Sequence, residues 1–233
     1  MNATAILAAA GSGERLGAGA PKAFVDLAGR PMIAWSLAAL DEASSVESVV
    51  VALPPGVRPE ESQAFDLALS GQTPRAVVPE VVAGGASRSE SVANALAKVE
   101  TDLVVVHDAA RPLAGADLFD AVLATLEADA EIAGVVAAAP VTDTTKEVLR
   151  GNEVHRTLDR SSLWSAQTPQ AFRTEALIAA LASTELLAQA SDDAMLVERT
   201  GGRVLVHPAP PENVKVTTPF DLLLAEVLLA ERG

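Results

Sequence analysis

Residues 6–24, ILAAAGSGERLGAGAPKAF, connect an apolar run to a glycine-rich loop that carries two basic residues. The apolar run is typical of a buried β-strand. The glycines of the loop expose backbone N–H groups that can bind phosphate oxygens. Arg15 and Lys22 add two cations within the same connection. The loop therefore suits a triphosphate, and a plain turn carrying two solvated cations is the alternative.

Two common phosphate-binding patterns fail on this loop. Gly11, Gly13 and Gly17 look like a dinucleotide-binding fingerprint, but their spacing differs from Gly-x-Gly-x-x-Gly. That fingerprint also requires an acidic residue after the second strand to bind the ribose, and VALPPG at 51–56 supplies none. The other pattern requires Gly-Lys-Ser or Gly-Lys-Thr before a helix, and it is absent from this loop. Both patterns are excluded.

Apolar runs typical of strands alternate with stretches of helical spacing along the rest of the chain. The expected strands lie at 4–10, 46–53, 75–82, 102–108, 131–139 and 202–207, and the expected helices at 32–42, 59–69, 89–99 and 116–128. A last helix is expected after Thr218, with Pro219 in its first turn and Asp221 completing a capping pattern. The alternation predicts an α/β fold with a mostly parallel sheet and helices on both faces.

Residues 140–172 interrupt this alternation because they are polar and contain a Gly-Asn turn signal. Short runs at 144–149 and 153–158 flank the turn and predict a β-hairpin. We expect the segment to project from the sheet as an arm. Since no linker or internal repeat divides the chain, the sequence predicts a single domain over residues 1–233.

The composition excludes several functions. With 31 acidic and 17 basic residues, the net charge of −14 opposes binding to nucleic acid and to anionic membranes. No apolar run reaches the ~18 residues that cross a bilayer, and no signal peptide is evident, so we expect no membrane association and a cytoplasmic location. The absence of cysteine excludes disulfides and thiolate chemistry.

A second polar cluster occurs in VVVHDAARP at 104–112. His107, Asp108 and Arg111 lie where the strand is expected to end, and ligands of open α/β sheets bind at the carboxyl ends of the strands. Close to phosphates, Asp108 is the type of oxygen ligand that Mg²⁺ prefers. The alternative for Asp108 is a helix cap or an ion pair with Arg111, and a structural role is favoured for His107.

Seven motifs follow one another along the chain: LAAAGSGERLGAGAPKAF, GGASRSESVANAL, VHDAARP, PVTDTTK, LDRSSLWSAQTPQAF, SDDAMLVE and NVKVTTPFDL. Together they resemble the 2-C-methyl-D-erythritol 4-phosphate cytidylyltransferase family over essentially the whole length. The resemblance implies a Rossmann-like nucleotidyltransferase fold and a homodimer formed through interlocking arms. It also implies transfer of CMP from CTP to a polyol phosphate with release of pyrophosphate, supported by Mg²⁺, in the non-mevalonate isoprenoid route.

The resemblance further implies roles for individual residues. Catalysis at the triphosphate is assigned to Arg15, Lys22 and Lys215. Nucleotide binding is assigned to Ala9, Ala10, Gly11, Gly13, Gly85 and Ser91. Binding of the polyol phosphate is assigned to Asp108, Ala109, Arg111, Thr144, Arg160 and Thr168. Within the last set Asp108 also supports the metal, whereas Thr144 and Arg160 lie on the arm and serve the substrate of the partner subunit.

Two of these residues also have simpler interpretations. Lys215 would suit an exposed edge strand, where lysine discourages aggregation. Arg160 would suit a surface ion pair with Asp159 or Glu153, which contributes little to stability.

The chain departs from the family pattern at two positions. Ala86 stands where an acidic residue is often found, which shifts base recognition toward backbone groups. Thr142 stands where a basic residue is often found in the arm, which leaves the phosphate contact there with less charge. Neither position is one that we assign to the chemistry.

The implied reaction agrees with the kinds of residue present. A phosphate monoester is largely ionised near neutral pH, so it attacks without a general base, and the main obstacle is repulsion between two anions. Two other functions stay open at this point. One is a cytidylyltransferase for a different polyol phosphate such as ribitol 5-phosphate, and the other is a regulator that binds a nucleotide without catalysis.

Overall fold

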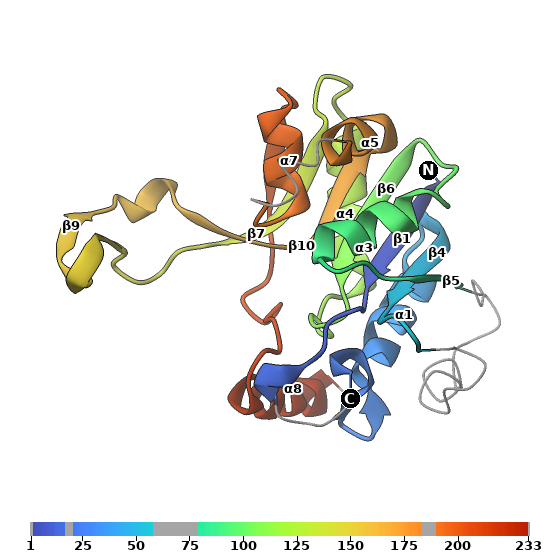
Figure 1. The fold of residues 1–233 in the computed structure, drawn as a ribbon, viewed down its shortest axis with the longest axis horizontal. Helices are drawn as coiled ribbons and strands as arrows, with labels where there is room; N and C mark the ends of the chain where they lie inside the picture. Colours follow the sequence, from blue (N-terminus) through green and yellow to red (C-terminus); the bar gives the residue numbers. More distant parts are fainter. Residues whose placement is uncertain (1, 17–20, 58–78, 183–189, 233) are drawn as a thin grey trace.

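The computed structural model describes residues 2–16, 21–57, 79–182 and 190–232, which form a seven-stranded sheet in the order β11-β7-β10-β6-β1-β4-β5 (Figure 1). Its strands are β1 (Ala3–Ala8), β4 (Val46–Leu53), β5 (Glu80–Ala83), β6 (Leu103–Asp108), β7 (Gly134–Pro140), β10 (Trp164–Arg173) and β11 (Val204–Pro208). β10 runs antiparallel to both of its neighbours, and the other neighbouring pairs are parallel. The expected mostly parallel sheet is confirmed.

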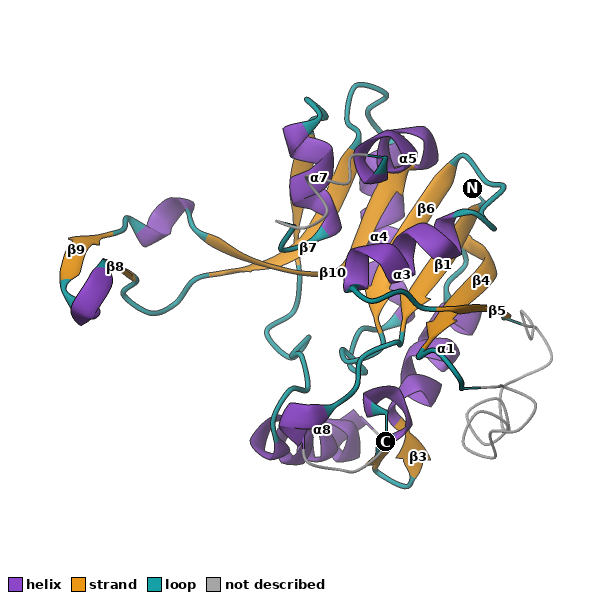
Figure 2. Cartoon of the chain, viewed as in Figure 1, coloured by secondary structure: helices purple, strands orange, loops and turns teal. Residues whose placement is uncertain are grey.

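Helices cover both faces of the sheet, as the alternation predicts (Figure 2). The helices on the sheet are α1 (Met32–Glu42), α3 (Arg88–Leu96), α4 (Ala116–Glu127), α5 (Thr174–Leu181) and α7 (Asp193–Arg199). The last helix, α8 (Pro219–Arg232), lies below the sheet in the view of Figure 1. The connection between β1 and α1 contains η1 (Glu14–Leu16), η2 (Lys22–Phe24), β2 (Asp26–Leu27) and β3 (Arg30–Pro31). The described residues include no helix long and apolar enough to span a membrane. The expected helix at 59–69, residues 75–78 of an expected strand, and Gly17 lie outside the described residues.

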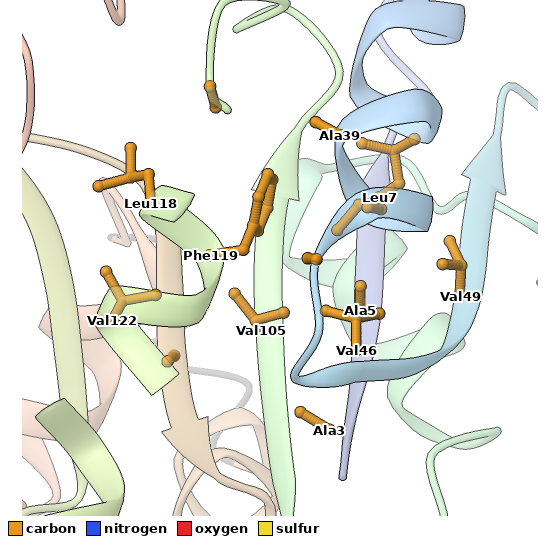
Figure 3. Packing of buried hydrophobic residues seen from close by; sticks show 14 of the residues in the cluster. Ala3, Ala5, Leu7, Ala39, Val46, Val49, Val105, Leu118, Phe119 and Val122 are labelled. Carbon is orange, nitrogen blue, oxygen red and sulfur yellow. The ribbon is translucent and has the colours of Figure 1, made fainter. Parts of the chain in front are cut away.

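Two apolar layers hold the helices against the sheet. On one face, Leu7 of β1, Val105 of β6 and Phe119 of α4 belong to one buried cluster (Figure 3). On the other face, Ile6 and Val106 belong to a second cluster that includes residues of α3, α5 and α7. Each such side chain contributes about 1.5–3 kcal/mol when it is fully buried. Because neighbouring residues of one strand enter opposite layers, a central strand carries consecutive apolar residues, as in 104–106 of β6.

The last helix begins with the predicted capping pattern. The hydroxyl of Thr218 accepts a hydrogen bond from the backbone N–H of Asp221 at 3.3 Å. The carboxylate of Asp221 accepts from the backbone N–H groups of Thr217 and Thr218 at 2.9 and 2.8 Å. These bonds satisfy N–H groups that the first turn of a helix leaves without partners. α8 then contributes Leu229 to a third buried cluster, to which the glycine loop contributes Leu16.

The predicted hairpin projects away from the sheet between β7 and β10 (Figure 1). It consists of β8 (Lys146–Val148), η4 (Arg150–Asn152), β9 (Val154–Thr157) and η5 (Arg160–Ser162). Gly151 and Asn152 have positive φ values of 76° and 63°, which suit a tight turn between antiparallel strands. Val148, Leu149 and Val154 are 48, 55 and 53% exposed. The arm therefore presents apolar side chains on its surface.

Residues 164–172 belong to the sheet and not to the arm, so the arm is shorter than the expected range of 140–172. They form most of β10, in which Gln170 pairs with Val106 of β6 and Val136 of β7. This strand was not expected, because its polar residues interrupt the apolar run that is typical of a buried strand. The polar side chains of β10 have a structural use, since they support the pocket described below.

Candidate active site

A pocket of about 670 Å³ lies at the carboxyl ends of β1 and β6. Ala8 and Asp108 end these two parallel strands and are paired in the register. Expected site residues that line the pocket are Ala9, Ala10, Gly11, Gly13, Arg15, Lys22, Gly85, Ser91, Asp108, Ala109 and Lys215. The structure thus brings the expected catalytic residues and the expected nucleotide-binding residues into one cavity.

The glycine loop curls so that its two cations face the same cavity. The backbone N–H of Leu16 donates to the carbonyl of Gly13 at 2.9 Å, and that of Lys22 donates to the carbonyl of Gly11 at 3.2 Å. Gly13 has a φ of +76°, and a Cβ there would lie 3.1 Å from the backbone of Lys22. Only glycine fits this close approach without strain. Arg15 in η1 and Lys22 in η2 therefore line one pocket.

The pocket lowers the proton affinity of Lys22. Its pKa is lowered to about 8, chiefly because burial disfavours the ammonium form, and repulsion from Lys215 and Arg15 adds to the effect. The carboxylate of Asp108 opposes this shift. Cations that are held together against their mutual repulsion form a site that suits a polyanion.

The loop after β5 forms the opposite wall and packs tightly against the glycine loop. A Cβ on Gly84 would lie 2.5 Å from the Cβ of Ala10, so a larger residue there would separate the two loops. The hydroxyl of Ser91 accepts from the backbone N–H of Gly85 at 3.0 Å and donates to the carbonyl of Ser87 at 2.8 Å. Ser91 therefore fixes the shape of this wall.

The wall keeps its shape without an acidic residue at position 86. The carboxylate of Glu90 accepts from the backbone N–H of Ala86 at 2.7 Å, while Ser87 accepts from the backbone N–H of Glu90 at 3.1 Å. This reciprocal arrangement is a variant of the capping box. It starts α3 at the edge of the pocket, which directs the first residue of the helix, Arg88, toward Asp108.

Asp108 lies between two cations at the end of β6. Its Oδ1 accepts from Nε of Arg88 at 2.9 Å, and its Oδ2 accepts from Nζ of Lys215 at 2.6 Å. Burial alone would raise the pKa of Asp108, but the charges of Arg88 and Lys215 outweigh it and hold the pKa well below its usual range. Arg111 donates instead to the backbone carbonyl of Asn213 at 2.8 Å. The proposed ion pair between Asp108 and Arg111 is therefore not the one that forms.

Lys215 lies in the loop between β11 and α8, so the edge-strand interpretation is wrong. The backbone N–H of Val216 donates to the carbonyl of Ala110 at 2.8 Å. The side-chain amide of Asn213 donates to the carbonyl of Thr168 at 2.9 Å. Hydrogen bonds on both sides of Lys215 thus tie the loop to the pocket.

A buried polar layer supports Asp108 from beneath. The hydroxyl of Thr168 accepts from the backbone N–H of Asp108 at 3.0 Å and bonds with Nδ1 of His107 at 3.0 Å. Nε2 of His107 bonds with the carbonyl of Arg111 at 3.1 Å, and its ring meets Phe119 edge-on. Burial lowers the pKa of His107 to about 4, so the ring is neutral near pH 7 and serves the structure. Arg111 and Thr168 lie beneath the cavity and are not in its lining.

Thr144 and Arg160 lie on the arm, which extends away from the sheet (Figure 2). Both residues are exposed, and the guanidinium of Arg160 donates to the carbonyl of Thr142. Asp159 accepts from the backbone and the hydroxyl of Ser161 at 3.0 and 2.8 Å, so its carboxylate caps η5. Within one chain, the two arm residues do not line the pocket.

Two carboxylates line this pocket, Asp108 and Glu14, and Asp108 is the one that we expected to bind a metal ion. The described residues contain no group of three His, Cys, Asp or Glu side chains able to hold a metal. Both oxygens of Asp108 already accept from cations, but each carboxylate oxygen has a second lone pair. Asp108 therefore fits Mg²⁺ as a single ligand, with substrate phosphates supplying most of the others.

Arg88 and Asp193 were not identified from the sequence. Nη1 of Arg88 donates to Oδ2 of Asp193 at 2.7 Å, and Asp193 is fully buried at the start of α7. The Ser-x-x-Glu pattern formed by Ser87 and Glu90 is the signal that places Arg88 in the first turn of a helix. No local signal identifies Asp193, because its partner lies 105 residues away.

The α/β sheet, the glycine loop and the cations gathered at the strand ends define a nucleotidyltransferase, since such a site aligns phosphates and neutralises their charge. The family model of IspD, 2-C-methyl-D-erythritol 4-phosphate cytidylyltransferase, matches residues 3–231. The chain belongs to this family.

Relatives with this name match nearly the whole chain. The protein of Frankia casuarinae is 44% identical over 228 residues, which cover 97% of this chain and 80% of the relative. The protein of Saccharopolyspora erythraea is 41% identical over 235 residues, which cover 99% and 100%. The crystal structure of 2-C-methyl-D-erythritol 4-phosphate cytidylyltransferase from Thermus thermophilus is 34% identical with a TM-score of 0.77, over 99% of this chain and 100% of that chain.

Proposed function

We propose that this chain transfers CMP from CTP to 2-C-methyl-D-erythritol 4-phosphate, which yields 4-diphosphocytidyl-2-C-methyl-D-erythritol and pyrophosphate. The observation that carries the proposal is the gathering of Arg15, Lys22 and Lys215 around one pocket at the strand ends. The relatives described above bear the name of this enzyme. The reaction is a step in the synthesis of isoprenoid precursors.

The reaction requires one anion to attack another. A phosphate oxygen of the polyol forms a bond to the α-phosphorus of CTP, while the bond from that phosphorus to the pyrophosphate oxygen breaks. The attacking phosphate is already ionised near neutral pH, so no proton has to be removed. Arg15, Lys22 and Lys215 neutralise the charge around the α-phosphorus and align the two substrates.

The remaining wall residues bind the nucleotide in this proposal. Gly11 and Gly13 let the backbone approach the phosphates closely. Ala9, Ala10 and Gly85 line the same cavity, and their backbone groups would face the base. Ser91 acts on the base through the loop that its hydroxyl fixes.

We propose Mg²⁺ as the divalent cation that enters with CTP. Asp108 would supply one carboxylate ligand, and the triphosphate would supply most of the others. When bound, Mg²⁺ withdraws negative charge from the phosphates that face the incoming anion. Asp108 and Ala109, which line the cavity, would also contact the polyol phosphate. Thr168 and Arg111 would support them from beneath, since both hydrogen-bond to the backbone of Asp108.

A homodimer would complete the site. Thr144 and Arg160 lie on an arm outside their own pocket, so we infer that they contact the substrate phosphate bound by the partner subunit. The exposed apolar residues Val148, Leu149 and Val154 support an arm that packs against another chain. The chain contains no cysteine, which is compatible with the reducing cytoplasm that we propose as its location.

The affinity for CTP should fall as the pH rises through 8. The pKa of Lys22 is lowered to about 8, so the ammonium that contacts the triphosphate is charged below this pH and is lost above it. The loss should approach about tenfold per pH unit, and CTP binding should take up protons in this range. Calorimetric titration between about pH 7 and pH 9 measures both quantities. Lys22→Arg stays charged and should show no such decline; an equal decline in that variant would contradict the assignment.

Pyrophosphate release from CTP tests the proposed function. We expect release to require both 2-C-methyl-D-erythritol 4-phosphate and Mg²⁺, and to stop when a chelator removes the metal. Ribitol 5-phosphate is the matched second acceptor. Release with ribitol 5-phosphate alone would transfer the assignment to another polyol, and CTP binding without release with either acceptor would indicate a regulator.

A further inference from the structure

We propose that Arg88 is a positioning residue, which holds Lys215 at the reacting phosphate by fixing the carboxylate of Asp108. The inference rests on the proposed function of this pocket, because Lys215 acts on the phosphates only if the chain is a nucleotidyltransferase. Arg88 itself would act through Asp108 and would not need to touch the substrate. Arg88 of α3 thereby links Asp193 of α7 to Asp108, which in turn pairs with Lys215 in the loop before α8.

The guanidinium of Arg88 is fixed in two directions. Nε donates to Oδ1 of Asp108 at 2.9 Å, and Nη1 donates to Oδ2 of Asp193 at 2.7 Å. A planar guanidinium with donors on different edges can bridge two carboxylates, which a lysine ammonium at the same position cannot do with the same geometry. The orientation of Asp108 therefore depends on the position of Asp193.

Asp193 is a rigid attachment point for this bridge. Its side chain is 0% exposed, and its second oxygen, Oδ1, has no hydrogen-bond partner among the described residues. The backbone N–H of Ala194 donates to the side chain of Gln170 in β10 at 3.2 Å, and Asp192 caps α7 by accepting from Met195 at 3.0 Å. A buried carboxylate with a single ionic partner keeps that partner in place, because losing it would leave an uncompensated charge.

Lys215 takes its position from the other oxygen of Asp108. Nζ of Lys215 lies 2.6 Å from Oδ2, and the side chain is 42% exposed, so the ammonium is held at the pocket wall and is still open to a ligand. Rotation of the Asp108 carboxylate would move Oδ2 and the ammonium together. Arg88 prevents this rotation by holding Oδ1.

A double-mutant cycle between Arg88 and Lys215 tests the proposal. Arg88→Lys keeps a positive charge but cannot bridge the two carboxylates with the same geometry. It should lower kcat by ~10–100-fold, the size of effect expected from misplacing a catalytic group by about 1 Å. The KM for CTP should change far less. In a Lys215→Met background, Arg88→Lys should cost almost nothing further, because the group that it positions is gone. Independent effects of the two substitutions on kcat would overturn the proposal.

Two further variants separate positioning from stabilisation. Asp193→Asn removes the charge that fixes Arg88 but preserves its shape, and its effect on kcat should likewise vanish in the Lys215→Met background. Arg173→Lys is the matched control, because Arg173 is a partly buried arginine that bonds the carbonyls of Ile132 and Asp129 at 3.0 and 3.1 Å. It should lower stability and leave kcat unchanged.

A crystal structure of the Arg88→Lys protein gives a readout that does not depend on activity. The contact between Asp108 and Lys215 should be lost, or Nζ displaced by about 1 Å. An unchanged contact would overturn the proposal even if the parent protein releases no pyrophosphate. Absence of release by the parent protein would overturn the proposed function instead, so the two failures are distinguishable.

Discussion

Lys22→Ala should lower kcat by about 10²–10³-fold, because it removes one preorganised cation from the site where charge builds up in the transition state. Lys22 lies in the same cavity as Arg15 and Lys215, and the pKa of Lys22 shows that burial and these neighbours already disfavour its charge. The substitution relieves that repulsion, so the protein should stay folded. Initial rates of pyrophosphate release at saturating substrates, together with the thermal unfolding midpoint, measure both effects.

Lys98→Ala is the matched control for this prediction. Lys98 is half exposed and pairs with Glu80 at 2.6 Å, and it is not among the residues that line the pocket. Loss of an exposed ion pair contributes little, so kcat should stay within about threefold of the parent value. A Lys22→Ala protein that also stays within this limit would contradict the role assigned to Lys22.

Mixing two inactive variants should restore activity if the arm serves the partner subunit. Arg160→Ala removes the arm's guanidinium from both sites of a homodimer, and Lys22→Ala removes the pocket's ammonium from both sites. A heterodimer would contain one site with both defects and one site with neither. With random exchange, half of the dimers are mixed, so activity per chain should return to about a quarter of the parent value.

The mixing experiment requires exchange of subunits, which co-expression of the two variants ensures. Arg156→Ala is the matched control, because Arg156 is also on the arm but pairs with Glu147 of the same arm. Alone, it should retain most of the activity. Absence of recovery in verified heterodimers would show that each site is completed within one chain, and it would refute the assignment of Arg160 to the partner's substrate.

The fold could be predicted wherever local patterns agree with the final packing. The helix at 32–42 and the strand at 46–53 occur with the expected bounds. The apolar residues of the helix pack on one face of the sheet, and those of the strand enter the buried clusters on both faces. The Gly-Asn turn at 151–152 correctly located the hairpin. β10 was missed because Gln167, Thr168 and Gln170 make it polar, and its place between β6 and β7 is fixed by tertiary pairing.

For the candidate site, local sequence predicted which residues lie at the strand ends but not which side chains pair with them. The positions of the glycine loop and of the strand ends predicted that Arg15, Lys22 and Asp108 face a common crevice, and all three line one pocket. The partners of Asp108 could not be predicted, because Arg88 is 20 residues away and Lys215 is 107 residues away. Ion pairs over such separations depend on how helices pack on the sheet, which local sequence does not specify.

In the proposed reaction, the phosphate of the polyol attacks CTP at its α-phosphorus. Phosphorus NMR of a reaction with CTP, Mg²⁺ and 2-C-methyl-D-erythritol 4-phosphate distinguishes the products. We expect equal amounts of pyrophosphate and of a diphosphate diester joining the polyol to cytidine. Formation of CDP, or CTP left unchanged by the folded protein, would contradict attack at the α-phosphate.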